Sequence, residues 1–301
     1  MTLLLLDSAS LWYRAYFGMP DTLLAPDGQP VHAIRGFLDM TSRLITQYRP
    51  DRMVACLEGD WRPSWRVELF PEYKANRLDE EGDEEEPDTL GPQIPILLDF
   101  LEECGIPLVG VDDFEADDVM ASFAAQHKGP IRIATGDRDL FQVIDPKKDV
   151  RIVYLARGIA QHELVDRAHV EKKYGIPGER YALFAMIRGD SSDGLPGIKG
   201  IGEKGAAEIA KNFKSMEEVI TAAKKGDSRL KPSLAKKIMD NLDYANIATE
   251  LVTCVRDIPL PNISIALPRP PKDFDRIKDF QNQYGLGASV DRFIAALGWE
   301  K

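Results

Sequence analysis

Several acidic residues in this sequence directly follow short apolar runs, and folding could gather them into one site. Carboxylate oxygens are the ligands that Mg²⁺ and Mn²⁺ prefer, and no histidine or cysteine cluster accompanies these acids. Like charges held close together repel, so a bound divalent cation is the simplest way to stabilise them. Two such ions roughly 4 Å apart are a standard device for hydrolysing phosphate esters. The acids are Asp7, Glu58, Asp60, Glu115, Asp117, Asp118, Asp137 and Asp139.

The elements that would position these acids alternate between strand and helix along the first half of the chain. Apolar runs predict buried strands, and the stretches between them have helical periodicity, as at 34–48 and 94–105. This alternation predicts an α/β fold with a mostly parallel sheet flanked by helices, whose carboxyl edge would collect the acids. From about residue 160 the pattern becomes helical, apart from a strand-like run at 262–267. The predicted strands are 3–7, 53–59, 106–111, 131–135 and 150–156.

Each acidic stretch also has a simpler interpretation when it is considered alone. Asp7 could cap a helix, "TGDRD" could form a turn, and the acids at 112–118 would favour the positive end of a helix dipole. Asp190 and Asp193, three residues apart before a glycine-rich stretch, could likewise belong to a turn or a cap. The arrival of acids after nearly every predicted strand favours a metal site over capping alone.

A glycine-rich stretch and two basic stretches could bind phosphate groups. "GLPGIKGIGEKGAAEI" (194–209) allows close backbone approach to a phosphate and begins a helix whose dipole is favourable, although it could also serve packing alone. The basic run 224–237 either extends the same face or forms a solvated helix. "RPSWRVELFPEYKANR" (62–77) offers aromatic rings to bases and cations to phosphates, or else is an amphipathic surface segment.

The composition is that of a globular protein whose charges are gathered in local patches. The net charge of −11 by itself argues against a nucleic-acid partner, but eight acids lie within 79–88 alone. No apolar run is long enough to cross a membrane and the first residues lack a basic signal-peptide region, so we expect a cytoplasmic protein. Cys56, Cys104 and Cys254 are far apart and are expected to be reduced core residues.

Four motifs in this order resemble the flap endonuclease, or 5′-nuclease, family, especially the N-terminal nuclease domain of bacterial DNA polymerase I. They are the Asp after the first strand, "PEYKANR", "EADDV" with "TGDRDL", and "GDSSDGLPGIKGIGEKGA". The resemblance extends to about residue 250. It implies a nuclease core over 1–175 with a helical arch at about 72–100, then a helix–three-turn–helix region and C-terminal helices over 176–301. Because no polymerase follows, we expect a stand-alone bacterial enzyme.

The resemblance also implies roles for individual residues. Lys74 and Arg77 would lie at the base of the arch and help to polarise the scissile phosphate. The glycine-rich stretch would hold the duplex backbone, in this family often with a K⁺ ion. The residues expected to bind DNA are Arg14, Tyr73, Gly197, Lys199, Gly200, Gly202 and Lys204. The residues expected to hold two or more Mg²⁺ or Mn²⁺ ions are Asp7, Asp60, Glu115, Asp117, Asp118, Asp137, Asp139, Asp190 and Asp193.

The sequence departs from the family pattern at several places. Ser8 follows the first Asp where Gly is usual, and Gly194 ends the "GDSSDG" motif where Asn is usual. The acid expected after the second strand is displaced by one residue, with Gly59 at the expected position and Asp60 as the best match. The arch segment is acidic, which puts in question how a DNA strand would be captured through it.

Together these features predict a metal-dependent flap endonuclease and 5′-3′ exonuclease that cuts DNA near the junction of single strand and duplex. We expect a monomer at the bacterial nucleoid that acts on 5′-flap, nicked or RNA-primed duplex during replication and repair, beside a DNA polymerase or ligase. A non-catalytic branched-DNA binding protein is the main alternative, which the gathered carboxylates disfavour. A phosphatase for small phosphoesters is a third, which the glycine-rich and basic stretches disfavour.

Overall fold

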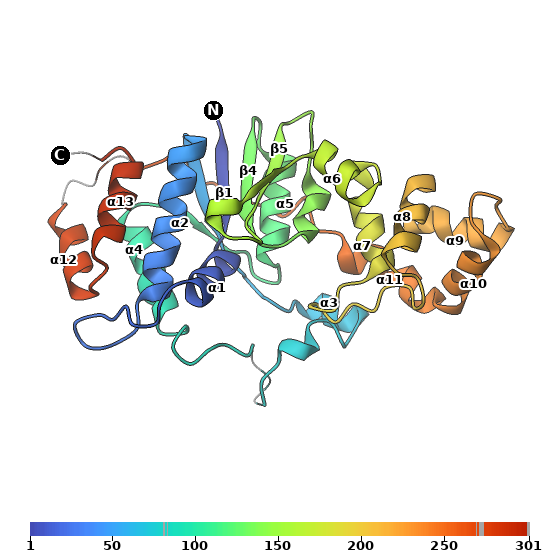
Figure 1. The fold of residues 1–301 in the computed structure, drawn as a ribbon, viewed down its shortest axis with the longest axis horizontal. Coiled ribbons are helices and arrows are strands. Elements are labelled where there is room, and N and C mark those ends of the chain that lie inside the picture. Colours follow the sequence, from blue (N-terminus) through green and yellow to red (C-terminus); the bar gives the residue numbers. More distant parts are fainter. Residues whose placement is uncertain (81, 83, 269, 271–273, 300–301) are drawn as a thin grey trace.

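A six-stranded sheet lies in the middle of an elongated molecule in the computed structural model (Figure 1). The structure describes residues 1–80, 82, 84–268, 270 and 274–299. The strand order is β3-β2-β1-β4-β5-β6, in which β1 to β5 pair in parallel and β6 is antiparallel to β5. The strands are β1 (Leu3–Asp7), β2 (Arg52–Cys56), β3 (Leu108–Val109), β4 (Ile131–Thr135), β5 (Val150–Tyr154) and β6 (Glu163–Val165).

The mostly parallel α/β fold and its first five strands are confirmed, with two corrections at the level of single strands. The strand β6 was not predicted, because three residues with only Val165 buried are too short to show a period-two pattern. The run at 262–267 is not a strand: within the described residues it forms an isolated bridge between Ala266 and Arg52. Its exposed Ile263 shows that apolar residues there do not all face the core.

Both faces of the sheet are buried, because successive residues of β1 point to opposite sides and all are apolar up to Asp7. Leu4 and Leu6 belong to one layer of the core, and Leu3 and Leu5 to the other. Burial of each such leucine stabilises the fold by about 1.5–3 kcal/mol. The helices on the Leu4 side are α1 (Ser8–Gly18), α2 (His32–Tyr48), α4 (Gln93–Glu103), α12 (Asp275–Gln283) and α13 (Ala288–Ala296). The helices on the Leu3 side include α5 (Ala116–Gln126) and α7 (Tyr181–Arg188).

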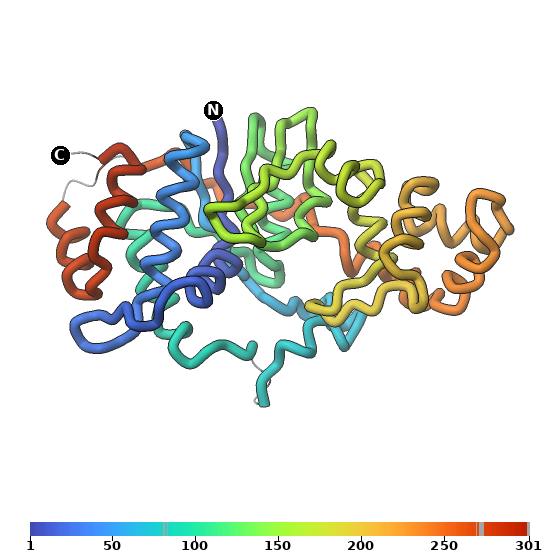
Figure 2. The backbone as a smooth tube through the Cα atoms, in the orientation of Figure 1, coloured from blue at the N-terminus to red at the C-terminus, as the bar shows by residue number. Residues whose placement is uncertain are grey.

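Two groups of helices extend the molecule beyond the sheet at opposite ends (Figures 1 and 2). At one end, α13 packs against α2 and α12 against α4. At the other end, α7 leads to a helical lobe that carries the glycine-rich stretch at its start. No helix in the described part of the chain combines the length and apolarity needed to span a bilayer. The lobe and its approach comprise α6 (Arg167–Tyr174), α8 (Glu203–Asn212), α9 (Met216–Lys225), α10 (Pro232–Asp240) and α11 (Leu242–Val252).

The segment predicted to form a helical arch is mostly irregular, which corrects that expectation. After α3 (Ser64–Leu69) the chain makes a 3-10 turn at Ala75–Arg77 and then turns and bends until α4 begins at Gln93. Figure 1 shows this part of the chain passing below the sheet as an open strap. The acids along 79–88 would repel one another at helical spacing, and Pro87, Gly91 and Pro92 disfavour a helix further along. Residues 81 and 83 of the predicted arch lie outside the described residues.

Candidate active site

The ends of β1 and β4 bring two predicted site residues together. Asp7 is buried, caps α1 by accepting from Ser10 N, and accepts from the Thr135 hydroxyl at 2.6 Å. Thr135 in turn accepts from Asp137 N at 2.8 Å, which ties the two strand ends together. Burial raises the pKa of Asp7 to about 6, and repulsion from Asp137 adds to the shift. Asp7 is therefore both a helix cap and a carboxylate whose ionised form is destabilised at the sheet edge.

The start of α5 adds two carboxylates to the same edge. Glu115 is the N-cap of α5 and accepts from the Tyr73 hydroxyl at 2.8 Å, while its other oxygen pairs with Lys74. Asp117 is the second residue of the helix and lines the same cavity as Asp7. Burial, then repulsion from Asp137 and Asp7, raises the pKa of Asp117 well above its usual range. The helix dipole alone does not offset this crowding.

Glu58, and not Asp60, is the carboxylate that reaches the cavity after β2. Asp60 accepts from Arg62 N in a local turn and does not line the cavity, so its assignment as a ligand stays a prediction that this placement does not favour. Glu58 lines the cavity, accepts from Ala116 N at 2.6 Å, and its pKa is raised by burial to about 8. From the sequence, both acids were expected at the end of the strand predicted at 53–59. Only the geometry of the turn after β2 shows which of the two faces the cavity.

Asp118, another predicted ligand, makes structural contacts away from the cavity, and its role as a ligand stays a prediction. It is fully buried and both its oxygens face Arg66 at 2.8 Å, one of them also accepting from Val255 N. Arg66 itself pairs with Glu115 at 3.3 Å and lies over the Trp65 ring. With its oxygens taken by these donors, Asp118 holds α3, α5 and the chain near Val255 together instead of facing the cavity.

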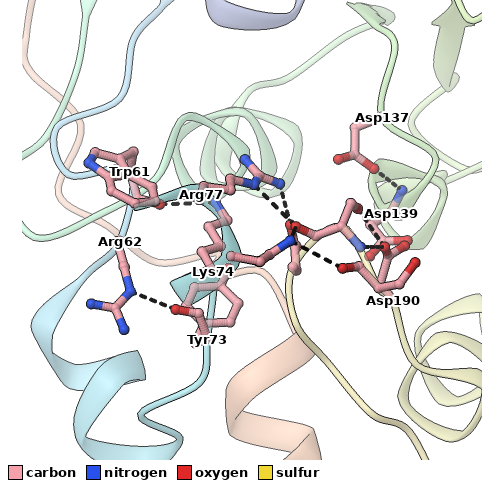
Figure 3. A network of polar contacts seen from close by, with 12 residues as sticks. Trp61, Arg62, Tyr73, Lys74, Arg77, Asp137, Asp139 and Asp190 are labelled. Carbon is pink, nitrogen blue, oxygen red and sulfur yellow. Dashed lines mark hydrogen bonds and ion pairs between the residues drawn. The ribbon is translucent and has the colours of Figure 1, made fainter. Parts of the chain in front are cut away.

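The remaining predicted ligands lie on the side of the glycine-rich stretch (Figure 3), each with an arginine partner. Burial and the charges of Asp137, Asp190 and Asp193 raise the pKa of Asp139 well above its usual range. Burial would also raise the pKa of Asp190, but hydrogen bonds from Ser192 and Arg138 lower it below its usual range. Burial raises the pKa of Asp193 to about 6. These acids therefore differ in how far their charge is compensated.

Lys74 and Arg77 lie at the cavity wall, opposite Asp137, Asp139 and Asp190 in the network of Figure 3. Lys74 is buried, with its Nζ 3.0 Å from Glu115 and from the Trp61 carbonyl oxygen. Arg77 pairs with Asp193 and donates to Ser192 O at 3.2 Å. The main-chain N–H of Lys74 also donates to Asp193 O. These contacts join the strap to the glycine-rich side of the site.

The two other residues predicted near the site differ in their access to a ligand. Arg14 lines the cavity of about 1000 Å³ and donates to Ala156 O at 3.3 Å. Tyr73 is only 3% exposed, which corrects its assignment as a DNA contact, because a buried ring cannot stack on a base. Its hydroxyl instead orients Glu115.

The glycine-rich stretch contains both a buried glycine that packs against α7 and exposed glycines next to α8. Gly197 is buried, and an added Cβ would lie 2.5 Å from Gly189 N, so this glycine packs against the end of α7 and does not face solvent as predicted. Gly200 and Gly202 surround the exposed N-terminus of α8, where Lys199 and Lys204 are exposed as well. Of the residues predicted here to contact phosphates, those at the start of α8, including the two lysines, are accessible to a ligand.

Two family descriptions together match most of the chain. The description "5'-3' exonuclease, N-terminal resolvase-like domain" matches residues 2–175, and "5'-3' exonuclease, C-terminal SAM fold" matches 176–273. The chain belongs to the 5′-3′ exonuclease family. This confirms the family that the four sequence motifs indicated.

Relatives within and beyond the family agree with this membership. The chain is 45% identical to a 5′-3′ exonuclease of Streptomyces coelicolor, covering 98% of this chain and 99% of that protein. It is 34% identical to a DNA polymerase I of Caldicellulosiruptor bescii, covering 86% of this chain but 30% of that protein. In fold it is similar to a bacteriophage T5 flap endonuclease, in a pseudo-enzyme–product complex with DNA and metal ions, with a TM-score of 0.57 at 15% identity over 99% of this chain and 100% of that chain.

The donor set of this family member suits a hard cation, although its side chains do not converge on a single point. Within the described residues, no three acidic, histidine or cysteine side chains are grouped closely enough to hold one ion. Glu115 and Asp193 are instead turned toward Lys74 and Arg77. Asp139 Oδ1 is buried without a hydrogen-bond partner among the described residues, and such an oxygen favours a cation. The oxygen-only donor chemistry therefore fits a hard divalent cation.

Sequence analysis alone missed some of the residues that organise the site. Arg66 was noted among basic residues but its partners Glu115 and Asp118 are distant in sequence. Arg188 immediately precedes the "GDSSDG" motif, and its guanidinium pairs with both Asp139 and Asp190. No spacing rule could have found these contacts, because they depend on tertiary packing.

Proposed function

We propose that this chain hydrolyses phosphodiester bonds in DNA that carries a 5′ flap, and that it acts as a 5′-3′ exonuclease on nicked or RNA-primed duplex. The observation that carries the proposal is the cavity wall, which combines crowded carboxylates with cationic side chains. A phosphodiester is negatively charged, so it would approach the carboxylates only with cations between them. The carboxylates of the wall include Asp7, Glu58, Asp117 and Asp137, and its cations include Lys74 and Arg77.

We propose that two or more Mg²⁺ or Mn²⁺ ions serve as cofactors. The T5 flap endonuclease that shares this fold was solved with DNA and metal ions, which supports a divalent cofactor here. When bound, such ions activate water for attack on phosphorus and stabilise the departing oxygen. The residues that would hold them are Asp7, Glu58, Glu115, Asp117, Asp137, Asp139, Asp190 and Asp193.

Lys74 and Arg77 would orient the scissile phosphate from the wall of the cavity. Burial alone would lower the pKa of Lys74, but Glu115 and Asp193 raise it above its usual range, so its ammonium stays charged at neutral pH. The guanidinium of Arg77 presents a planar fork that matches phosphate oxygens. Entry of a phosphate would exchange their carboxylate partners for the substrate, which would free Glu115 and Asp193 to bind cations.

The exposed start of α8 would hold the duplex backbone without reading its sequence. The helix N-terminus, Gly202 and the lysines Lys199 and Lys204 suit phosphate oxygens and offer no base-specific donor pattern. A K⁺ ion at this turn would have to share the Gly200 carbonyl with Lys237 Nζ, which lies 2.5 Å from it. We therefore assign the positive charge at this carbonyl to Lys237.

We propose that the chain works as a monomer in the bacterial cytoplasm, at the nucleoid. A 5′ flap arises when a polymerase extends into the next fragment and displaces its 5′ end, which carries the RNA primer, so removal of the flap and the primer belongs to replication and repair. A DNA polymerase would supply the substrate and a ligase would seal the product. The similarity to part of a DNA polymerase I supports this setting.

The proposal is tested with a labelled 5′-flap duplex, in Mg²⁺ or Mn²⁺ and in chelator. Asp137→Asn should reduce cleavage roughly 100-fold or more, because it removes a charged metal ligand. Flap binding, measured by fluorescence anisotropy with Ca²⁺, should persist. The control Asp99→Asn changes an exposed acid of α4 and should cleave at the wild-type rate.

Two outcomes would replace the proposal with its alternatives. Flap binding by the wild-type chain without metal-dependent cleavage would indicate a non-catalytic branched-DNA binding protein. Hydrolysis of small phosphoesters but not of DNA would indicate a phosphatase. Unchanged cleavage by Asp137→Asn would show that the site is assigned wrongly.

A further inference from the structure

Trp61 is an aromatic residue of the site that lies just before the stretch expected to offer rings to bases. Within that stretch, 62–77, the ring of Tyr73 is buried, and Trp65 is held by its Nε1, which donates to Asp113 O at 3.1 Å. Neither residue lines the cavity, whereas Trp61 lines it and is half-buried there. The side chain that could offer a ring to a ligand in the cavity is therefore that of Trp61.

The backbone on both sides of Trp61 is fixed by hydrogen bonds. Gly59 N and Asp60 N donate to the same oxygen, Phe114 O, at 3.1 and 3.0 Å. The next residues form a turn in which Asp60 Oδ1 accepts from Arg62 N at 2.9 Å. These bonds hold the turn against the chain that leads into α5, so the backbone that carries the indole is rigid.

Arg62 and Lys74 join this turn to the start of the strap. Arg62 Nε donates to Tyr73 O at 2.6 Å, and Arg62 Nη2 donates to Pro71 O at 2.7 Å. Lys74 Nζ donates to Trp61 O at 3.0 Å (Figure 3). The backbone of Trp61 and the ammonium of Lys74 therefore keep a fixed relation, so a nucleotide that touches the indole can also place a phosphate at Lys74.

The ring of Trp61 has no such partners. Among the described residues, it belongs to neither layer of the hydrophobic core, and no other ring or cation stacks on it. The other aromatic rings of the described cavity wall come from α1 and are engaged: Trp12 is buried, Tyr13 donates its hydroxyl hydrogen to the strap, and Phe17 packs edge-on against another ring. A half-buried indole on a rigid turn is a surface that a flat apolar group can cover.

We propose that Trp61 stacks on the nucleobase next to the scissile phosphate and so positions that phosphate at Lys74. This inference rests on the proposed hydrolysis of flap DNA. Stacking on an aromatic side chain accepts every base, because each base has a π face, so it holds the nucleotide without reading a base edge. A purine has the larger face and stacks more strongly than a pyrimidine. A modest sequence preference would then come from one base beside the cut.

The test measures single-turnover cleavage of a labelled 5′-flap duplex in which the nucleotide on one or the other side of the cut is abasic. Trp61→Leu removes the ring but keeps an apolar side chain, whereas Trp61→Phe keeps a ring. On the intact duplex, Trp61→Leu should cleave roughly tenfold or more slowly than wild type, and Trp61→Phe should restore most of the rate. At the abasic position that stacks, wild type should slow by a similar factor and Trp61→Leu no further. Wild type should also favour a purine at that position, and Trp61→Leu should not.

Two matched controls separate stacking from a general loss of structure. Tyr284→Leu removes a half-buried ring at the end of α12, outside the cavity wall, and should cleave every substrate like wild type. An abasic nucleotide several positions away from the cut should slow wild type and Trp61→Leu alike. A second measurement uses Ca²⁺, with which binding is followed without cleavage. Flap DNA should quench the tryptophan emission of wild type more than that of Trp61→Phe, and the abasic nucleotide should remove this difference.

The inference is overturned if Trp61→Leu cleaves the intact duplex at the wild-type rate, or if it is as defective on both abasic duplexes as on the intact one. Metal-dependent cleavage by wild type would then leave the proposed function standing, whereas no cleavage by wild type would remove both. If Trp61→Leu does not fold, the quenching comparison with Trp61→Phe decides. Equal quenching of these two proteins would count against stacking.

Discussion

At the scale of single residues, the chemistry of the site depends on which carboxylates remain without a cationic partner. Asp118 and Glu58 are both acids at the sheet edge, yet Arg66 takes both oxygens of Asp118 while Glu58 faces the cavity. Removing Arg66 would leave a buried, unpaired charge, which costs about 3–5 kcal/mol when one partner of a buried pair is lost. The site thus combines structural ion pairs with carboxylates that stay available.

Glu58 and Asp60 allow a direct test of the assignment after β2. Glu58→Gln should weaken Mn²⁺ binding about 10–100-fold and slow flap cleavage, because it removes one of the carboxylates that line the cavity. Asp60→Asn should leave Mn²⁺ affinity and cleavage unchanged, since Asp60 accepts only from Arg62 N among the described residues and lies outside the cavity wall. Calorimetry and a flap assay measure the two variants in parallel. The reverse ranking would restore Asp60 as the ligand.

At the scale of elements, we expect the start of α8 and the strap at 72–92 to play different parts in binding DNA. The helix start is exposed, carries lysines and has no side-chain cap hydrogen bond, which suits a phosphate. The strap is acidic, and Glu84 and Glu86 line the cavity beside Arg77. Affinity for duplex is therefore expected from α8, while the strap shapes the way into the site.

Lys204 tests the role of the α8 start in binding the duplex. Lys204→Ala should weaken binding of flap DNA for every sequence and reduce the slope of log Kd against log salt by about 1, because one phosphate contact is lost. The control Lys128→Ala changes an exposed lysine before β4, at the opposite edge of the sheet. Anisotropy titrations over a range of KCl concentrations give both values. An unchanged slope would place the duplex elsewhere on the lobe.

At the scale of the whole molecule, we expect the site to couple the stability of the fold to pH and to divalent cations. The carboxylates at the edge join β1, β2, β4 and α5, so their repulsion acts on the centre of the sheet. Burial raises the pKa of Asp7 to about 6 and that of Glu58 to about 8. The division into 1–175 and 176–301 stays a prediction.

The chain without divalent cations should lose stability as the pH rises. Between the ordinary carboxyl pKa near 4 and the raised values, the folded chain holds more protons than the unfolded chain, so the free energy of unfolding falls with increasing pH. In chelator, Tm should therefore decrease from pH 5 to pH 8. Added Mg²⁺ should raise Tm most at pH 8, where these carboxylates would be ionised. Differential scanning calorimetry at the two pH values measures this. A Tm that rises with pH in chelator would contradict it.

The sequence by itself determined the parallel α/β fold and the edge at which the acids meet. Apolar runs separated by helical periods leave few other topologies, and parallel strands end along one edge, so Asp7, Glu115 and Asp137 had to arrive close together. The sequence was sufficient for this prediction because the same local pattern, an apolar strand followed by an acid, recurs along the chain.

Only the tertiary structure decided which acids stay available, because that depends on partners far away in sequence. Arg66 from α3 pairs with Asp118 in α5, and Arg188 from α7 pairs with Asp139 after β4. After β2, Asp60 accepts from Arg62 N in a local turn, whereas Glu58, two residues earlier, lines the cavity. The charge of a buried carboxylate is governed by every group within a few ångströms, and only packing brings those groups together.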